Sequence, residues 1–303
     1  MTFASKTACR MSAPNVNPSL SPGLIERLLS KLGFREAPER TFAGLRALYA
    51  AWCRNVPFDN VRKLIHVRSG HAGPLPGSTA DDFLEAWLRH GTGGTCWAGN
   101  GAFATLLQSL GFEAERGVCT MLAAPDIPPN HGTVRVTFEG RHFLTDCSML
   151  HVEPLPLNVY GTGRINHPVW GVHTSLRDGR LHVWWRALHR VDGFECRIER
   201  FGVDDAEFRR RHYETRGWSP FNYEVNARRN LADRVTGLAF GNALSLEGDG
   251  SVRQRPVDDA ERRRVLIEEV GMSEEIVSQL PEDTPTPPPP GSRTAQERER
   301  AGG

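Results

Sequence analysis

The chain has 303 residues, of which 39% are hydrophobic, and its 37 Lys and Arg residues almost balance its 36 Asp and Glu residues. Such a chain can bury a substantial core as one large domain or as two to three compact subdomains. The near-neutral charge predicts no nucleic-acid or anionic-membrane partner, because it creates no overall positive field to attract one. No run of about 18 apolar residues occurs, and the N-terminus lacks the apolar stretch of a secretory signal, so we expect a soluble, cytoplasmic protein.

The six cysteines are scattered through the chain, and no two of them form a CxxC pair. This distribution fits neither a disulfide framework nor a zinc cluster, and no metal site is expected. At most one or two of the thiols are therefore expected to carry chemistry.

The first third of the chain is predicted to be helical. Residues 1–22 are rich in Ser, Pro, Ala and Asn, which is typical of a disordered extension. Apolar residues then recur at helical spacing in LIERLLSKLGF and in TFAGLRALYAAWCRNV, where Thr41 can cap the second helix. Pro57 interrupts the pattern, a Gly- and Pro-rich loop follows at 69–78, and another helix is expected at TADDFLEAWLRH. Residues 23–92 thus predict a helical bundle.

The middle of the chain changes to strand patterns. The segments EAERGVCTML, GTVRVTFEGRHFLTDC, GRLHVWWRALHRV and FECRIERF alternate and are separated by Gly, Pro and Asp-Gly turns. Consecutive hairpins of this kind predict a closed or strongly curved antiparallel sheet within residues 93–203. A helix, a hairpin turning at Asp249-Gly250 and a closing helix are expected at 204–280, before a Pro-rich, disordered tail at 281–303.

The segment GTGGTCWAGNGAFATLLQSLGF contains a candidate nucleophile. Cys96 follows closely spaced glycines and stands just ahead of an amphipathic helical stretch at 101–110. A thiol at a helix N-terminus is exposed to the positive end of the helix dipole and to free amide donors, and both favour the reactive thiolate. An isolated cysteine, however, is far more often a small buried apolar residue.

His131 and Asp146 are predicted to lie near each other. His131 begins one predicted strand, Asp146 ends the next, and a turn at Glu139-Gly140 joins the two. An antiparallel pair places the start of one strand beside the end of the other. Cysteine, histidine and aspartate are the nucleophile, base and orienting carboxylate of covalent acyl transfer. Spacing alone leaves the alternatives open, since histidines in turns and aspartates at strand ends are common.

Several motifs together resemble the arylamine N-acetyltransferase family. They are the opening helices, the segment Pro57-Phe58-Asp59-Asn60, the run Gly93-Gly94-Thr95-Cys96-Trp97 with Asn100-Gly101, and a weaker echo at Ser219-Pro220-Phe221 with Arg229-Asn230. The cysteine of this signature carries the acyl group in the family, and the family's histidine and aspartate correspond to His131 and Asp146. The resemblance extends over about residues 24–280.

This resemblance implies an α+β fold with an N-terminal helical bundle, a central antiparallel β-barrel and a C-terminal α/β lid around a papain-like Cys-His-Asp core. It also implies ping-pong transfer of an acyl group through Cys96, from an acyl thioester donor to a small-molecule amine such as an arylamine. Acetyl-CoA or another acyl-CoA would be the cosubstrate, and no permanently bound cofactor is implied. Substrate contacts are expected from Phe58, Trp97, Met149 and Phe221.

The sequence departs from the family pattern at three places. Thr92 replaces the usual Arg and Ala98 the usual Glu, and losing both partners of a buried ion pair together can be neutral. The stretch after the aspartate reads Cys147-Ser148-Met149-Leu150 in place of smaller residues, which we expect to narrow the donor pocket. Two alternative functions remain open. One is a natural-product amide synthase that takes a longer acyl chain from an acyl carrier protein, and the other is a transglutaminase-like hydrolase.

Overall fold

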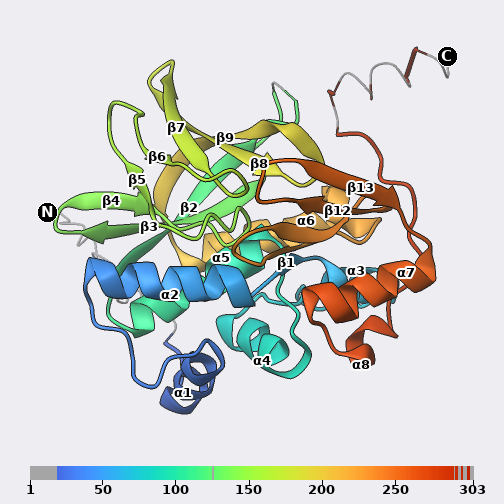
Figure 1. Cartoon of the computed structure of the whole chain (residues 1–303), viewed down its shortest axis with the longest axis horizontal. Helices are drawn as coiled ribbons and strands as arrows, with labels where there is room; N and C mark the ends of the chain where they lie inside the picture. Colours follow the sequence, from blue (N-terminus) through green and yellow to red (C-terminus); the bar gives the residue numbers. More distant parts are fainter. Residues whose placement is uncertain (1–18, 125, 290, 293–294, 296–298, 301–303) are drawn as a thin grey trace, which may run out of the picture.

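The computed structural model describes residues 19–124, 126–289, 291–292, 295 and 299–300 (Figure 1). Its first section is helical, as predicted, and most of the expected extension 1–22 lies outside the described residues. Thr41 caps the second helix by accepting a hydrogen bond from the backbone N–H of Gly44 at 3.0 Å, which confirms the predicted cap. The helices of this section are α1 (Pro22–Lys31), α2 (Phe42–Asn55), α3 (Val61–Arg68), α4 (Ala80–His90) and α5 (Cys96–Ser109).

Helix α5 begins at Cys96 itself, five residues earlier than its amphipathic pattern indicated. The reason is that α5 is buried on almost every side, between the other helices and the barrel, so its first turns show no polar face. Helix α3 and a short strand before it, β1 (Phe58–Asp59), were not predicted.

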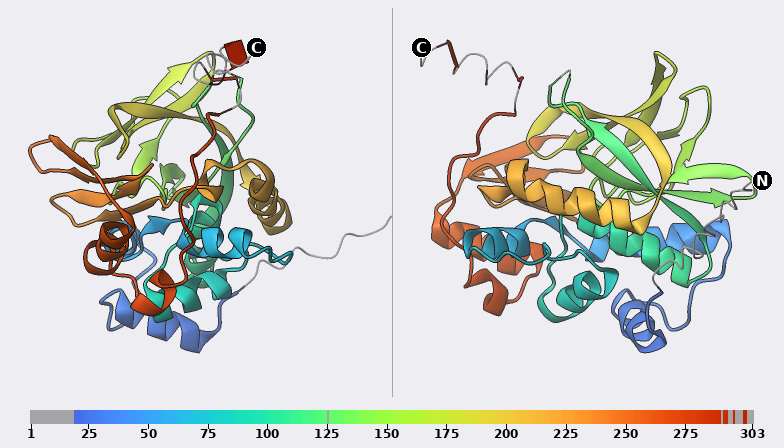
Figure 2. Two further views of the ribbon diagram at one scale, coloured as in Figure 1. Left: turned by 90° about the vertical axis from the view of Figure 1, so that its right-hand side faces the viewer. Right: turned by 180° about the vertical axis from the view of Figure 1, so that it is seen from behind.

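Within the described part of the chain, the middle section is an antiparallel sheet of eight strands in the order β5-β4-β3-β2-β9-β8-β7-β6. Strands β5 and β6 stand at opposite ends of this order and contact each other, so the sheet curls into a nearly closed barrel (Figures 1 and 2). The predicted curved antiparallel sheet is thereby confirmed. Its strands are β2 (Glu113–Met121), β3 (His131–Phe138), β4 (Arg141–Leu144), β5 (Leu155–Leu157), β6 (Arg164–Ile165), β7 (Val172–Arg177), β8 (Arg180–Ala187) and β9 (Arg190–Val203).

The third section joins helices to a second antiparallel sheet, in the order β1-β10-β11-β12-β13. The single predicted hairpin at Asp249-Gly250 is in fact two, because the chain also turns at Phe240-Gly241. Phe240 has a φ of 49°, which is unusual for a bulky residue and hid this turn from the sequence pattern. The elements are α6 (Asp205–Trp218), the 3₁₀ turn η1 (Pro220–Asn222), β10 (Ala227–Asn230), β11 (Val235–Ala239), β12 (Asn242–Leu246), β13 (Val252–Pro256), α7 (Asp259–Arg264), the π-helical turn η2 (Val265–Val270) and α8 (Glu274–Val277).

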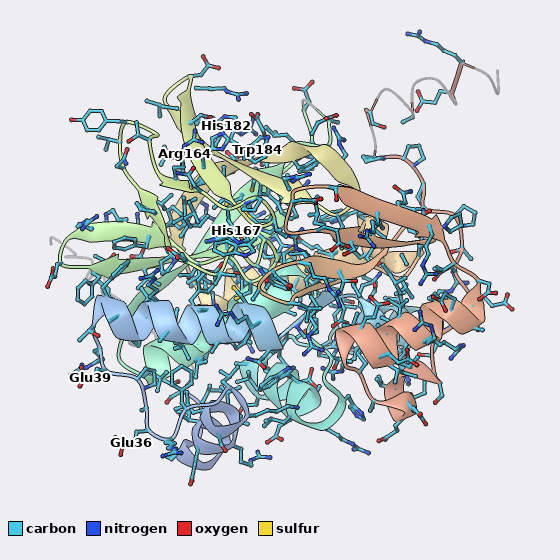
Figure 3. All side chains as sticks on the ribbon, in the orientation of Figure 1. Glu36, Glu39, Arg164, His167, His182 and Trp184 are labelled. Carbon is cyan, nitrogen blue, oxygen red and sulfur yellow. The ribbon has the colours of Figure 1, made fainter. Side chains whose placement is uncertain are left out.

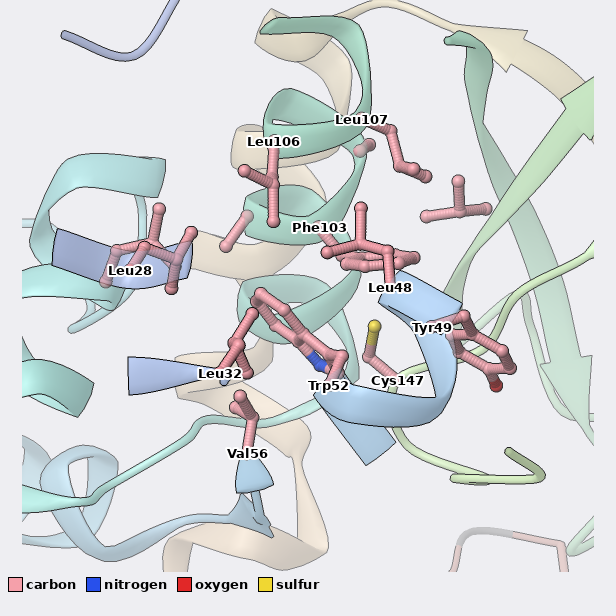
Figure 4. Close-up of a cluster of buried hydrophobic side chains, with 14 of the residues drawn as sticks. Leu28, Leu32, Leu48, Tyr49, Trp52, Val56, Phe103, Leu106, Leu107 and Cys147 are labelled. Carbon is pink, nitrogen blue, oxygen red and sulfur yellow. The ribbon is translucent and has the colours of Figure 1, made fainter. Parts of the chain in front are cut away.

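The largest core lies between α2, α4, α5 and the barrel. Trp52 of α2 stacks on Phe83 of α4 with ring centroids 5.8 Å apart, and it packs against Phe103 of α5 at 4.9 Å. Cys147 points into the same cluster, beside Trp52 and Tyr49 (Figure 4). This core therefore connects the helix that begins at Cys96 to the loop that follows Asp146.

Residues 281–289 of the predicted tail form neither a helix nor a strand, and they are hydrogen-bonded to the third section. Asp283 accepts a hydrogen bond from the backbone N–H of Val225 at 3.0 Å and pairs with Arg262 at 2.6 Å. The backbone N–H of Thr286 donates to the carboxylate of Glu224 at 3.1 Å. Figure 2 shows this red segment rising from the helices toward the barrel. Much of the remaining tail lies outside the described residues.

The domain limits derived from the sequence stay a prediction. The sections are not separate in space, because β1 and α3 of the first section pack on the third. Among the residues that the structure describes, no helix has both the length and the apolar character needed to cross a membrane.

Candidate active site

Cys96 occupies the first position of α5, where the chain leaves a glycine-rich loop. Its neighbour Thr95 has the extended conformation of an N-cap, yet the Thr95 side chain does not cap the helix. The amides of a helix's first turn have no partner within the helix, so here they are available to an anion. The side chain of Cys96 is buried and forms part of the wall of a cavity.

The loop before Cys96 is held by Asp59. Its carboxylate accepts a hydrogen bond from the backbone N–H of Gly93 at 2.6 Å and another from that of Val61 at 3.0 Å. Gly93 must be glycine, because a Cβ there would lie 1.7 Å from the carbonyl oxygen of Pro57. The next residue, Asn60, accepts a hydrogen bond from the backbone N–H of Asn226 in the third section at 2.8 Å. One short motif therefore anchors both the nucleophile loop and the third section.

His131 and Asp146 form a buried pair, with Nε2 of the imidazole 2.7 Å from Oδ2 of the carboxylate. The β3–β4 hairpin turns at Glu139-Gly140, as predicted, and its register brings the start of β3 beside the residues that follow β4. The other carboxylate oxygen of Asp146 accepts hydrogen bonds from the backbone N–H groups of Ser148 at 2.9 Å and Met149 at 3.1 Å. Every oxygen of the carboxylate thus has a defined donor, which sets the orientation of the imidazole.

The electrostatics of this pair favour a charged imidazolium. Burial raises the pKa of Asp146, but the charge and hydrogen bond of His131 and the amide of Ser148 outweigh it, so the pKa lies well below its usual value. Burial also lowers the pKa of His131, yet the charge of Asp146 and the electrostatic influence of Cys96 outweigh it and hold that pKa well above 6.5. The three predicted residues therefore meet at one point, and His131 can keep its proton beside the sulfur.

Asn100 connects the nucleophile helix to both supporting residues. Its amide nitrogen donates to the carbonyl oxygen of Gly132, next to His131, at 2.7 Å. Its amide oxygen accepts from the backbone N–H of Cys147, next to Asp146, at 2.9 Å. The sequence singled out Asn100 only as part of a motif, because the two partners lie 32 and 47 residues away along the chain.

The cavity in front of Cys96 has a volume of about 660 Å³. Phe58, Trp97 and Phe221 line it, and their contact with a substrate stays a prediction. The rings of Phe58 and Phe221 meet edge to face with centroids 5.2 Å apart. Met149 is instead buried in the barrel core, so its expected place in the pocket is not supported. Ser148 is the residue of that segment that lines the cavity.

The departures at Thr92 and Ala98 are accommodated by packing. Both side chains are buried, and Ala98 lies against two glycines, since a Cβ at Gly77 would be 2.6 Å, and one at Gly94 2.9 Å, from the methyl group of Ala98. A glutamate at position 98 would have no room in this arrangement. The hydroxyl group of Thr92 has no hydrogen-bond partner. At position 98, the neighbouring glycines thus leave space only for a small side chain.

Three of the other described cysteines lie in surroundings that disfavour the thiolate, which gives a labelling prediction. Burial raises the pKa of Cys53 to about 12 and holds the pKa values of Cys147 and Cys196 well above their usual value. Since only the thiolate alkylates quickly, iodoacetamide at neutral pH should label Cys96 first, by at least about tenfold. Peptide mapping in a Cys9→Ser background measures the rates and removes a thiol outside the described residues. Equal labelling of Cys53 or Cys147 would show that Cys96 is not the activated thiol.

A second hollow of about 520 Å³ lies on the barrel and is lined by Arg164, His167 and Trp184, labelled in Figure 3. None of the predicted site residues lines it. Over the described ranges, no group of three or more His, Cys, Asp and Glu side chains is placed to hold a metal ion.

The structure is similar to solved acyltransferases of one class. It matches the arylamine N-acetyltransferase of Mycobacterium abscessus with a TM-score of 0.71 and 18% identity, covering 84% of this chain and 93% of that one. It matches the arylamine N-acetyltransferase of Mycobacterium marinum in complex with CoA with a TM-score of 0.70 and 19% identity, covering 85% and 95%. At these identities the likeness establishes the fold, and it confirms the α+β architecture that the motifs implied.

The model of the N-acetyltransferase family matches residues 41–276. This chain therefore belongs to that family, and the resemblance inferred from its motifs is confirmed. In sequence it is 28% identical, over 117 residues, to the arylamine N-acetyltransferase of Mycolicibacterium smegmatis. That alignment spans 37% of this chain and 40% of the relative's length.

Proposed function

We propose that this protein moves an acyl group from an acyl thioester to a small-molecule amine through a thioester on Cys96. The observation that carries the proposal is the buried pair of His131 and Asp146, 2.7 Å apart, beside a thiol at the N-terminus of α5. Nucleophile, base and orienting carboxylate in this arrangement are the requirements of covalent acyl transfer. The proposed donor is acetyl-CoA or another acyl-CoA, in keeping with the family and with the CoA complex of the M. marinum relative.

The proposed reaction has two half-reactions. The Cys96 thiolate attacks the carbonyl carbon of the donor, the bond to the CoA sulfur breaks, and the leaving CoA thiolate takes the proton of the His131 imidazolium. The amine then attacks the Cys96 thioester and gives a proton to the imidazole as the Cys96 thiolate leaves. Free amides at the start of α5 would stabilise the oxyanion of each tetrahedral intermediate. Asp146 keeps the imidazole in the tautomer and orientation that both steps need.

The test is to trap the intermediate and follow its product. Incubation with acetyl-CoA alone should add one acetyl group to the peptide that contains Cys96, and an arylamine should then remove it as the acetylarylamide. Mass spectrometry measures the first step, and chromatography of acetylarylamide against free acetate measures the second. Free acetate as the main product would favour the hydrolase alternative. Acylation only by longer thioesters would favour the amide synthase. No observation on the described residues favours either one.

A further inference from the structure

Lys63 is a buried cation on the wall of the proposed active-site cavity. It lies on α3, its side chain is 4% exposed, and it lines the same cavity as Cys96. Its Nζ atom has no hydrogen-bond partner. An ammonium group that is buried without a partner costs several kcal/mol or loses its proton. Neither structural packing nor the proposed acyl transfer explains this side chain.

The surroundings of Lys63 contain positive charge but little to balance it. The pKa of Lys63 is lowered to about 7, mainly by burial; the thiol of Cys96 on α5 raises this pKa, and the charge of Arg216 on α6 adds to the lowering. His212, also on α6, faces the same amine, and the charge of Lys63 helps burial to lower the pKa of His212 to about 3. The amine of Lys63 and the sulfur of Cys96 therefore face one cavity and affect each other electrostatically.

The rest of the cavity wall also carries positively charged side chains and hydrogen-bond donors, with few acceptors to balance them. Among its described lining residues there is no Asp or Glu, whereas Arg190 and Arg228 are present and Arg228 is buried. The hydroxyl groups of Thr95 and Ser148 also line the cavity, are buried and have no hydrogen-bond partner. Arg228 donates to the carbonyl oxygen of Arg186 at 2.8 Å through one nitrogen, but its buried Nε has no partner. Buried donors of this kind, with no carboxylate beside them, form an environment that an anion would complete.

We propose that Lys63 binds a carboxylate of the substrate, close to the reacting atoms, and so selects for an anionic acyl chain or an anionic amine. This inference rests on the proposed acyl transfer. The CoA phosphates do not meet the requirement, because the pantetheine arm separates them from the thioester that reacts at Cys96. Two sources of the carboxylate share the same chemistry: a dicarboxylic acyl group on the donor and an amino acid or aminobenzoate as the acceptor.

Lysine suits this task better than arginine. When the site is empty, the lysine amine can be neutral. A guanidinium would stay charged, and its desolvation would destabilise the protein with or without a ligand. The chain has only three lysines, Lys6, Lys31 and Lys63, against 34 arginines. One of these three lines the cavity, where an amine can be neutral when the site is empty and charged when an anion binds.

The test compares matched neutral and anionic substrates in Lys63→Met, which keeps the length of the side chain. The acceptors are 4-aminobenzoate and 4-aminobenzamide, with S-acetyl-N-acetylcysteamine as a donor without phosphates. The donors are the S-succinyl and S-butyryl thioesters of N-acetylcysteamine, with a neutral arylamine. The control is Lys31→Met, because Lys31 lies on α1 and donates to the carbonyl oxygens of Trp87 and Leu88 at 2.9 and 3.0 Å.

Lys63→Met should lower kcat/KM for the anionic member of one pair by roughly ten- to hundredfold, the range for a buried hydrogen bond between charged groups. The pair affected identifies the source of the carboxylate. For the neutral substrates, kcat/KM should change by less than about twofold in Lys63→Met. In Lys31→Met, kcat/KM should change by less than about twofold for all four substrates. Equal losses for neutral and anionic members would overturn the inference. So would a loss that appears only with CoA thioesters, since the anion would then be a phosphate.

Calorimetry on the wild-type protein tests the inference without any variant. The ligand is the anionic acceptor if the acceptor pair responded, or an unreactive S-succinyl thioether if the donor pair responded. Its binding near pH 7 should be accompanied by proton uptake. The uptake is measured as a binding heat that depends on the ionisation enthalpy of the buffer. No uptake would overturn the inference. Acyl label that resists hydroxylamine and maps to Lys63 would overturn it as well, because an acylated amine cannot hold a carboxylate. Failure of the underlying acyl transfer is distinguishable, since no substrate would then acylate Cys96.

Discussion

Cys96→Ala is expected to abolish the acyl-enzyme completely, and His131→Gln is expected to slow acylation by roughly a thousandfold or more. Asp146→Asn should slow it as well, because an amide in place of the carboxylate favours the wrong imidazole tautomer. Rapid-quench mass spectrometry of the Cys96 peptide measures all three rates. The matched control is His142→Gln, since His142 is an exposed histidine on β4 and should leave acylation unchanged.

The penalties of the triad variants should not add. Asp146 contacts the imidazole at 2.7 Å and is expected to act only through it, so His131→Gln with Asp146→Asn should be little slower than His131→Gln alone. The alternative outcome is a double variant that loses the full sum of both single penalties while circular dichroism shows a native fold. Asp146 would then have a role of its own in the reaction.

The pH dependence of acylation gives the same prediction an independent check. In the native protein the pKa of His131 lies well above 6.5, so the imidazolium persists and the acylation rate should change little between pH 6 and 8. Removing the Asp146 charge takes away the largest contribution that opposes burial, so the pKa of His131 falls. In Asp146→Asn the thiol must then ionise without a cation beside it, and the rate should rise with pH across this range. A falling or flat profile in the variant would contradict the ion-pair interpretation.

Asn100→Ala is expected to weaken both stability and catalysis. It leaves the carbonyl oxygen of Gly132 and the backbone N–H of Cys147 buried without their partner, which should cost about 2–4 kcal/mol in the free energy of unfolding. Acylation should fall by roughly tenfold or more, because the helix carrying Cys96 is no longer tied to the residues beside His131 and Asp146. Urea unfolding and the acylation assay measure the two effects.

Two further variants distinguish the effect of Asn100 on the positions of the triad residues from its effect on the stability of the fold. Asn100→Asp keeps an acceptor for Cys147 but cannot donate to Gly132, so its effect on acylation should fall between the wild type and Asn100→Ala. Asn55→Ala is the control, since Asn55 is exposed and donates only to Ala51 within its own helix. If Asn100→Ala acylates at the wild-type rate once folded, Asn100 stabilises the fold without positioning the triad.

Local patterns predicted the supporting pair and the nucleophile for reasons that the structure makes clear. A β-hairpin is specified by neighbouring residues, so the turn at Glu139-Gly140 was enough to place His131 near Asp146. The glycines before Cys96 marked a close approach of backbones, which the structure shows at Gly93. Met149 was expected in the pocket because it replaces a smaller residue of the family pattern, but the loop after β4 turns its side chain into the barrel core.

The helices with polar faces and the consecutive hairpins of the barrel could be predicted because each depends on residues that are near one another along the chain, and the family could be predicted from its motifs. The pairing of β1 could not be predicted, since its partner β10 is about 170 residues away. The start of α5 at Cys96 and the position of Asn100 between the supporting residues likewise depend on contacts between distant segments. Lys63 carries no sequence signal, because its burial results from α3, α5 and α6 meeting around the cavity, a contact that no local pattern encodes.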